Sequence, residues 1–433
     1  MPNNALTAVR SNSMPVAGPT AQQPVPPTLL PADLQALIES MTPTITKFRQ
    51  ASSPNEIALN QQTLSMGQSD SVPITSVGLG YRLVTEHTTT ITLDNTASSA
   101  QTYQVSDKFP YNLIDNTTVD INGGAKTYSA SGVGGLLVAV RGRRGALNPS
   151  GTALNAALVG ITLTNVTSTA STGFTLSGYA SFNVAATTTG TIVVKWIEFQ
   201  KLAFSRDTLI GALPLQNKQT ECSITRTMKG SLTGTNNLSP IYVAGGFPST
   251  TTVTVSDVVQ TTYKFWSVPT DPALYQDMVM NSYQILEQPK NVVNNTGSEA
   301  LVYNIPNNAY LTALHMLISD TNGNYVSTPT GIPKYSLTYS GSVLTPARSY
   351  GNRRRAEEWL DYGSDLGSVS GYLLWDGSNT TDDLNTSDEA GWLNTYTAAS
   401  PQLIADVADT LATPLNFSVT REQIVADAVN QIA

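Results

Sequence analysis

The residue types that carry most enzyme chemistry are rare in this chain of 433 residues. It has two histidines, His87 and His315, and one cysteine, Cys222. A nucleophilic triad would need one of these histidines beside a nucleophile and a carboxylate. Both histidines lie on segments with strand-like alternation, so a hydrogen-bonded histidine inside a sheet is the favoured interpretation, and Cys222 is interpreted as a small buried hydrophobe. The sequence therefore predicts a protein that is not an enzyme.

Motifs for metals and phosphates are incomplete. Residues 320–324 resemble a calcium loop, but the glycine comes one place early and Gly331 stands where a bidentate glutamate is needed. The acidic segment 381–389 is a better calcium candidate, although a solvated loop is the favoured interpretation. The glycines of 132–135 lack the Lys-Ser/Thr pair of a phosphate loop, and one cysteine with two distant histidines excludes an ordinary zinc site. We expect no cofactor and no metal.

The charge pattern argues against a sequence-specific or general nucleic-acid binder. Only 12% of the residues are charged and the net charge is -8, whereas nucleic-acid binders cluster Lys and Arg to neutralise phosphates. Two basic clusters are interpreted as subunit contacts in preference to contacts with nucleic acid or lipid: Arg141, Arg143 and Arg144, and Arg353, Arg354 and Arg355. The chain starts without a secretory signal pattern and has no apolar run of ~20 residues, so we expect neither export by that route nor a membrane span.

The first fifty residues divide into an arm and a helix. Residues 1–31 are rich in Pro, Ala, Gln and Ser, a composition typical of a flexible arm. The segment 32–54 is predicted to hold an amphipathic helix that Pro43 ends or kinks. Its apolar stripe and nearby basic residues either pack beneath the chain's own sandwich or contact a membrane or a neighbouring subunit: Leu34, Leu37, Ile38, Met41, Ile45, Lys47, Phe48 and Arg49.

Beyond residue 54 the alternation is that of strands, in two long Thr/Ser/Asn-rich segments. This pattern predicts an all-β fold of two tandem eight-stranded jelly rolls, at 55–203 and 220–420, joined by a linker at 204–219. Residues 421–433 are predicted to be a C-terminal tail, with a short helix within 420–433. Further short helices are expected at 128–140, after an Asn-Gly-Gly hairpin at 122–124, and at 351–360.

Three patches of this sequence resemble a known family. They are the strand and linker of 192–219, the Arg353–Arg355 cluster followed by the aromatic strand 371–376, and the closing strand 415–419 with the Thr-Arg-Glu-Gln of 420–423. In this order they resemble the double jelly-roll major capsid proteins of tectivirus-like phages, which enclose an internal membrane. The chain departs from that family in its longer Pro-rich arm and in an insertion at 382–399.

The resemblance implies a function in assembly. It implies homotrimers that form pseudo-hexagonal capsomers of an icosahedral shell, with the N-terminal helix toward an internal membrane that encloses the genome. The implied partners are other copies of the chain, minor capsid and vertex proteins and the membrane. The implied location is the virion, assembled in the host cytoplasm. Loops at 230–248 and 377–399 are expected at the outer ends of the rolls.

A second function remains open at this stage. A β-sandwich spike or adhesin that binds a receptor or carbohydrate would use exposed aromatic side chains to stack on sugar rings, and Trp375, Trp392 and Tyr396 are the candidates. Glycan binding by the isolated protein would favour it. A hydrolase on a jelly roll would need clustered histidines or carboxylates, which this sequence pattern does not indicate.

Overall fold

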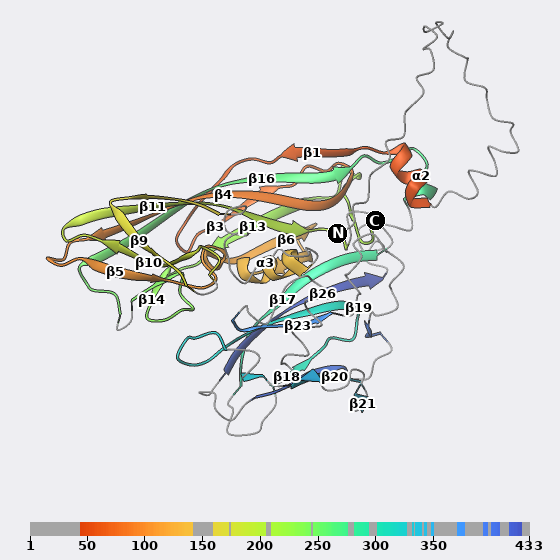
Figure 1. Cartoon of the computed structure of the whole chain (residues 1–433). Helices are drawn as coiled ribbons and strands as arrows, with labels where there is room; N and C mark the ends of the chain where they lie inside the picture. Colours follow the sequence, from red (N-terminus) through yellow and green to blue (C-terminus); the bar gives the residue numbers. More distant parts are fainter. Residues whose placement is uncertain are drawn as a thin grey trace, which may run out of the picture.

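The computed structural model describes most of the chain from Thr44 onward (Figure 1). The described residues are 44–141, 159–172, 175–204, 209–243, 246–275, 281–293, 301–326, 331–332, 334–339, 342–343, 348–349, 370–376, 393–396, 400–407 and 415–426. The predicted arm, the predicted helix at 351–360 and the acidic segment 381–389 lie outside these ranges. So do the following candidate residues: Leu34, Leu37, Ile38, Met41, Arg143, Arg144, Arg353, Arg354, Arg355 and Trp392.

Long antiparallel strands form one wall of the first roll, sheet A. Its strands are, in spatial order, β1 (Pro54–Ala58), β16 (Thr251–Trp266), β4 (Leu79–Asn95), β11 (Thr188–Lys201) and β8 (Val159–Thr164), with β2 (Gln62–Ser65) beside β16 and β12 (Leu213–Pro214) beside β4. From Leu83 to Asn95 every second residue of β4 is buried, because successive side chains of a strand point to opposite faces. The predicted alternation is therefore confirmed in this strand.

A second sheet, sheet C, covers part of sheet A (Figure 1). Its order is β14 (Thr233–Gly234), β15 (Ile241–Tyr242), β5 (Gln101–Val105), β10 (Tyr179–Val184) and β9 (Val166–Ala170). The inner faces of the two sheets enclose one hydrophobic core, where Ile91, Tyr103, Phe182 and Ile192 are fully buried. Burial of apolar surface, at about 25 cal/mol per Å², is the main stabilising contribution here.

Sheet B runs through both halves of the molecule. Its order is β23 (Tyr372–Asp376), β19 (Tyr310–Ser319), β26 (Leu415–Ala426), β17 (Asn281–Val293), β7 (Ala125–Ala130), β6 (Ile114–Ile121), β13 (Cys222–Met228) and β3 (Ser69–Pro73), with β24 (Leu393–Asn394) beside β19. The halves meet where β17 pairs in parallel with β7, through Ile285 with Tyr128 and Leu286 with Ser129. The two halves are thus joined by backbone hydrogen bonds as well as by side chains.

Sheet D closes the second roll over its own core. It consists of β18 (Leu301–Asn304), β25 (Gln402–Asp406), β20 (Lys334–Tyr339), β21 (Ser342–Val343) and β22 (Arg348–Ser349). Leu314, Ile318, Leu337 and Leu403 are among the buried residues between sheets D and B. A short 3-10 turn, η1 (Tyr111–Leu113), lies in a connection of the first roll, and a second, η2 (Pro272–Leu274), lies in the connection from β16 to β17.

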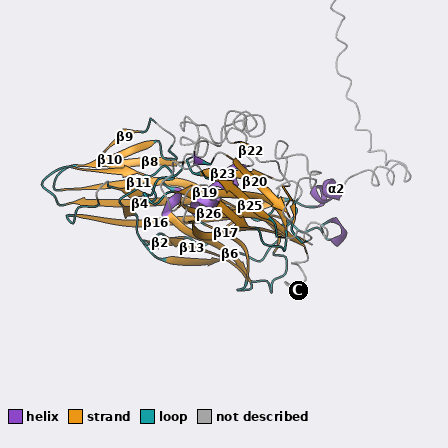
Figure 2. Cartoon of the chain, turned by 90° about the horizontal axis from the view of Figure 1, so that it is seen from below, coloured by secondary structure: helices purple, strands orange, loops and turns teal. Residues whose placement is uncertain are grey.

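Two α-helices are described. Helix α2 (Thr44–Ala51) starts directly after Pro43 and lies at one end of the first roll (Figures 1 and 2). Helix α3 (Gly132–Arg141) lies between the two rolls (Figure 1). The helix predicted at 128–140 is present from Gly132, but Tyr128 belongs to β7, because its ring is fully buried in the sheet core. The predicted hairpin is also present, with positive φ at Asn122 and Gly123.

The strand pairing divides the chain later than the sequence pattern predicts. Residues 222–266, placed in the second roll by the sequence, pair with the first roll: β13 with β6, β15 with β5 and β16 with β4. The sheets therefore divide between Trp266 and Asn281, and the described part of the predicted linker, 204 and 209–219, lies inside the first roll. The predicted tail also differs, because Arg421 to Ala426 continue β26 and pair with β17 in place of forming a helix.

Candidate functional site

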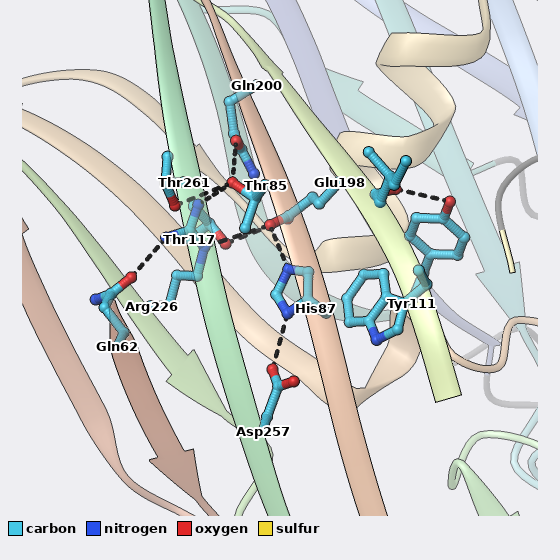
Figure 3. Close-up of polar contacts among 12 residues, drawn as sticks. Gln62, Thr85, His87, Tyr111, Thr117, Glu198, Gln200, Arg226, Asp257 and Thr261 are labelled. Atoms are coloured by element: carbon cyan, nitrogen blue, oxygen red, sulfur yellow. Dashed lines mark hydrogen bonds and ion pairs between the residues drawn. The ribbon is translucent and has the colours of Figure 1, made fainter. Parts of the chain in front are cut away.

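The first buried polar cluster of the chain is centred on His87, which, like Thr85 and Thr89 in β4, is buried in the first roll (Figure 3). Its Nδ1 lies 2.8 Å from Oδ2 of Asp257 on β16. Its Nε2 faces Oε2 of Glu198 on β11 at 3.5 Å, as an ion pair without hydrogen-bond geometry. The imidazole stacks on Trp196 with ring centroids 3.8 Å apart. Two carboxylates from different strands thus hold one imidazole.

Arg226 on β13 brings a second cation to the same cluster from the opposite sheet. Its Nε donates to Oε2 of Glu198 at 3.5 Å and its Nη1 donates to the side-chain oxygen of Gln62 at 2.7 Å. Its Nη2 also donates to the hydroxyl of Thr85. Thr117 donates to the other oxygen of Glu198 at 3.3 Å. We call His87, Glu198, Arg226 and Asp257 the His87 cluster; it joins sheets A and B by charge.

Burial and charge oppose each other in the His87 cluster. Desolvation lowers the pKa of His87, but the hydrogen bond and charge of Asp257, with Glu198, outweigh it and raise that pKa above 6.5. Burial raises the pKa of Glu198, but His87 and Arg226 outweigh it, so that the pKa lies below 4.5. A buried charge is tolerated only when it is paired and hydrogen-bonded, and the cluster meets this condition.

The second histidine occupies a similar position in the second roll. His315 on β19 contacts the hydroxyl of Tyr372 through Nδ1 at 2.9 Å and Oε1 of Glu422 through Nε2 at 2.8 Å. Tyr283 donates its hydroxyl to the other oxygen of Glu422. Lys201, from β11 of the first roll, places Nζ 3.9 Å from that oxygen. Unlike the His87 cluster, which lies within the first roll, this second cluster therefore links the two rolls.

Two further contacts between the rolls involve charged groups. Glu287 on β17 accepts a hydrogen bond from the backbone N–H of Ser131, directly before helix α3, where the helix dipole favours a negative charge. Lys108 donates from Nζ to the carbonyl of Ser370 at 2.8 Å and lies 4.7 Å from the ring centroid of Tyr325. Burial lowers the pKa of Lys108 to about 8. These contacts hold the two rolls together, and the clusters likewise hold strands of the fold together.

The chemistry available at these clusters is limited by their burial. His87 and His315 are each only 1% exposed, so that a substrate has no access to them in this conformation. Burial also raises the pKa of the Cys222 thiol to about 12, which suppresses the thiolate that a nucleophile needs. Within the described part of the chain no group of three or more His, Cys, Asp or Glu residues could hold a metal ion. The arrangement stabilises and orients strands.

The candidate surface residues have different environments. Phe48 is fully buried beside Leu79 and Leu209, and its ring centroid lies 5.8 Å from that of Trp266. It therefore packs beneath its own sandwich, the first of the two interpretations. Lys47 is half-buried and Arg49 is exposed on α2. The side chains of Ile45 and Arg141 lie outside the described set, although their backbones belong to α2 and α3.

The aromatic residues proposed for sugar stacking are not all at the surface. Trp375 is 9% exposed and packs in the core of the second roll, because its position on β23 faces that core, whereas Tyr396 is 43% exposed. The prediction of an exposed Trp375 is wrong. No described helix is long and apolar enough to cross a membrane.

Comparison with known proteins shows similarity in structure only. No family model matches the sequence and no curated protein matches it. Among solved structures, the major capsid protein of Sulfolobus turreted icosahedral virus, STIV, is similar over 88% of this chain and 99% of its own, with a TM-score of 0.54 and 16% identity. The Faustovirus major capsid protein is similar over 87% and 91%, with a TM-score of 0.51 and 9% identity.

The chain has the double jelly-roll fold. The resemblance noted in the sequence is thus confirmed for the fold. The number of eight strands in each roll stays a prediction. At 9% and 16% identity the likeness concerns the arrangement of strands and transfers no individual side chain.

The sequence interpretation missed the partners of both histidines. Glu198, Arg226, Asp257 and Glu422 were not singled out, although the first three lie on segments with strand-like alternation; Glu422 was placed in the predicted tail. A signal was present in the alternation: Glu198 follows Trp196 by two residues, so it points to the same buried face of the strand as Trp196 and the apolar residues before it. A charged residue at a buried position of a strand needs a buried partner. The interpretation of His87 as a hydrogen-bonded strand histidine is confirmed.

Proposed function

We propose that this protein is a major capsid protein that acts by self-assembly, with homotrimers forming pseudo-hexagonal capsomers of an icosahedral shell. The observation that carries the proposal is the extent of the double jelly roll, which is shared over 88% of this chain and 99% of the STIV major capsid protein. The likeness extends over both rolls and their junction, so it concerns the whole building block and not one sandwich.

The junction between the rolls supports this proposal physically. A shell subunit has to transmit force between neighbours without bending. Sheet B continues through both rolls, and Lys108, Lys201 and Glu287 add side-chain contacts across the junction. Backbone pairing together with buried polar contacts resists hinge motion, because a hinge motion would break these hydrogen bonds and leave buried polar groups without partners.

We extend the proposal to an internal membrane, minor capsid and vertex proteins, and the virion as the location. Helix α2 lies at the end of the first roll where β4 starts and β16 ends (Figure 1). This end carries Arg49 and Lys47, whose charges suit anionic head groups, while Phe48 anchors the helix to its own roll. We propose that this end faces the membrane.

The first experiment is native mass measurement with negative-stain imaging of the full chain. A stable trimer with a hexagonal outline, and closed shells at higher concentration, would support the proposal. A strictly monomeric protein at all concentrations would contradict it. Glycan binding by such a monomer would favour the spike or adhesin function.

A truncation tests the role of the N-terminal part. Removing residues 1–43 keeps Phe48, whose loss would open the cavity that it fills beside Leu79. We expect unchanged trimers and an unchanged melting temperature, but impaired shell formation or impaired recruitment of anionic vesicles. Shells and vesicle recruitment equal to those of the full chain would contradict a role in either step.

A further inference from the structure

Strand β9, Val166–Ala170, is the outermost strand of sheet C (Figure 2). It pairs with β10 on one side, and no described strand pairs with it on the other. Four of its five residues, Thr167 to Ala170, are exposed, so side chains of both strand faces are in solvent. Only Val166 packs against the core. The strand therefore contributes little to the core of its own chain.

This edge lacks the features that usually prevent strands from pairing with other chains. An open edge presents unpaired N–H and C=O groups, and proteins protect such edges with charges, prolines or bulges. The edge strand β1 has Pro54 and Glu56, and the edge strand β3 has Asp70 and Pro73. The sequence of β9, VTSTA, contains none of these, and the preceding strand β8, VGITLT, is also uncharged.

The geometry of β9 is also regular enough for pairing. The register shift of its ladder with β10 occurs between Tyr179 and Ser181, opposite the end of β9 at Ala170. From Val166 to Thr169 the ladder is regular. Thr and Val suit a pleated strand that packs against another strand. The contrast between this edge and the protected edges indicates that another strand pairs with β9.

We propose that a second copy of this chain pairs with β9, edge to edge and antiparallel. An uncharged strand meets its own copy without the like-charge repulsion that destabilises cross-strand pairs. Antiparallel pairing about a two-fold axis is self-complementary, as in an isologous interface. With Ser168 on the axis, Thr167 lies opposite Thr169 of the second copy. The proposal rests on the proposed function in one respect, since it names a contact within the assembly.

A cysteine at the axis tests this register directly. Cys222 is the only cysteine of the chain and is buried, so a surface cysteine adds the one accessible thiol. In the full-length protein, Ser168→Cys is expected to form a covalent dimer under mild oxidation, because directly opposed Cβ atoms lie about 4.5–5.5 Å apart, close to disulfide geometry. The matched control is Ser256→Cys, exposed on β16 but flanked by β4 and β2, which is expected to stay monomeric on a non-reducing gel.

Lysine substitutions on β9 test the contact between the two copies whatever the register of their pairing. Thr167→Lys with Thr169→Lys is expected to reduce self-association at least tenfold, while Ser256→Lys has no effect, and circular dichroism checks that each variant folds. If wild type forms trimers and shells, and the lysine variant assembles equally without a Ser168→Cys dimer, the β9 proposal is overturned and the proposed function stands. If wild type forms neither trimers nor shells, the proposed function fails, whereas a Ser168→Cys dimer would still support the β9 contact.

Discussion

When protonated, His87 stabilises the first roll as a cation that is held away from water. Asp257 lies 2.8 Å from one ring nitrogen and Glu198 lies 3.5 Å from the other, and Arg226 offsets part of their charge. A base whose pKa is raised on folding stabilises the folded state fully below its unfolded pKa, here about 6.5. This stabilisation is lost as the pH rises through the raised pKa of the folded state.

Substitution His87→Gln is expected to lower the free energy of unfolding by about 3 kcal/mol at pH 6, because it removes one partner from a buried charge cluster. We expect this deficit to shrink as the pH rises through the raised pKa of folded His87, where the wild type loses its proton. Urea unfolding of both proteins at a series of pH values from 6 upward measures the difference. Lys108, whose pKa is about 8, titrates in both proteins, so its contribution cancels in the difference between their free energies of unfolding.

The control is a surface ion pair. Lys264 and Glu56 lie 2.9 Å apart with side chains that are 34% and 63% exposed, so Lys264→Gln is expected to change stability by at most about 1 kcal/mol. A deficit for His87→Gln that stays equally large at every pH of the series would show that the shape of the side chain, and not its charge, explains the role of His87.

Helix α3 depends on glycines where it approaches the buried clusters. A Cβ on Gly135 would overlap the hydroxyl of Tyr128, and one on Gly134 would lie 2.7 Å from Oε2 of Glu287. Glycine lowers the stability of a helix by about 1 kcal/mol relative to alanine. The glycines therefore weaken the helix but allow close packing between the two rolls.

Substitution Gly135→Ala is expected to destabilise the protein by about 1–3 kcal/mol, because overlap in a packed core outweighs the gain in helix propensity. Thermal melting measures the effect. Gly124→Ala is the matched control, since a Cβ at Gly124 meets no atom within 4 Å, and it is expected to stay within about 0.5 kcal/mol of wild type. A raised melting temperature for Gly135→Ala would contradict this account of α3.

Alternation allowed the sequence to predict strands but not their partners. The strands β4, β11, β16 and β19 lie within the two segments that the sequence predicts to be strands, because alternation is a local property. The predicted C-terminal helix failed at Ile424, whose neighbours also fit helical spacing. In the structure Ile424 pairs with Tyr283 and is buried in sheet B. Tertiary pairing outweighed local propensity there.

The whole molecule is expected to unfold as one unit. β17 pairs with β7 across the junction, and Lys201 and Glu287 make contacts between the rolls. Calorimetry should therefore show a single transition, with equal calorimetric and van't Hoff enthalpies as the test of two-state unfolding. Two separate transitions would contradict it.

A fragment gives an independent test of this cooperativity. Residues 276–433 expressed alone lack β7, which pairs with β17, and they lack Lys201. We expect this fragment to show no cooperative unfolding by circular dichroism, whereas the full chain does. A folded fragment with its own sharp transition would show that the rolls are independent.

The boundary between the rolls could not be predicted from local sequence. The stretch at 204–219 contains the turn residues Gly211 and Pro214 and lies near the middle of the chain, and both features suggest a linker. β16 nevertheless returns to pair with β4, more than 150 positions earlier in the chain. Such long-range pairing depends on which apolar faces complement each other, and a single sequence does not specify that choice locally.

The position of β26 has a consequence for how the protein is made. β26 lies between β17 and β19 in sheet B, yet it follows both of them in the chain. As the polypeptide leaves the ribosome, β17 and β19 therefore emerge before the strand that separates them. Until β26 is synthesised, two apolar strand edges are open to wrong partners, which is a condition that favours aggregation. Production of this protein should accordingly benefit from slow synthesis and abundant chaperones more than from any change to its surface.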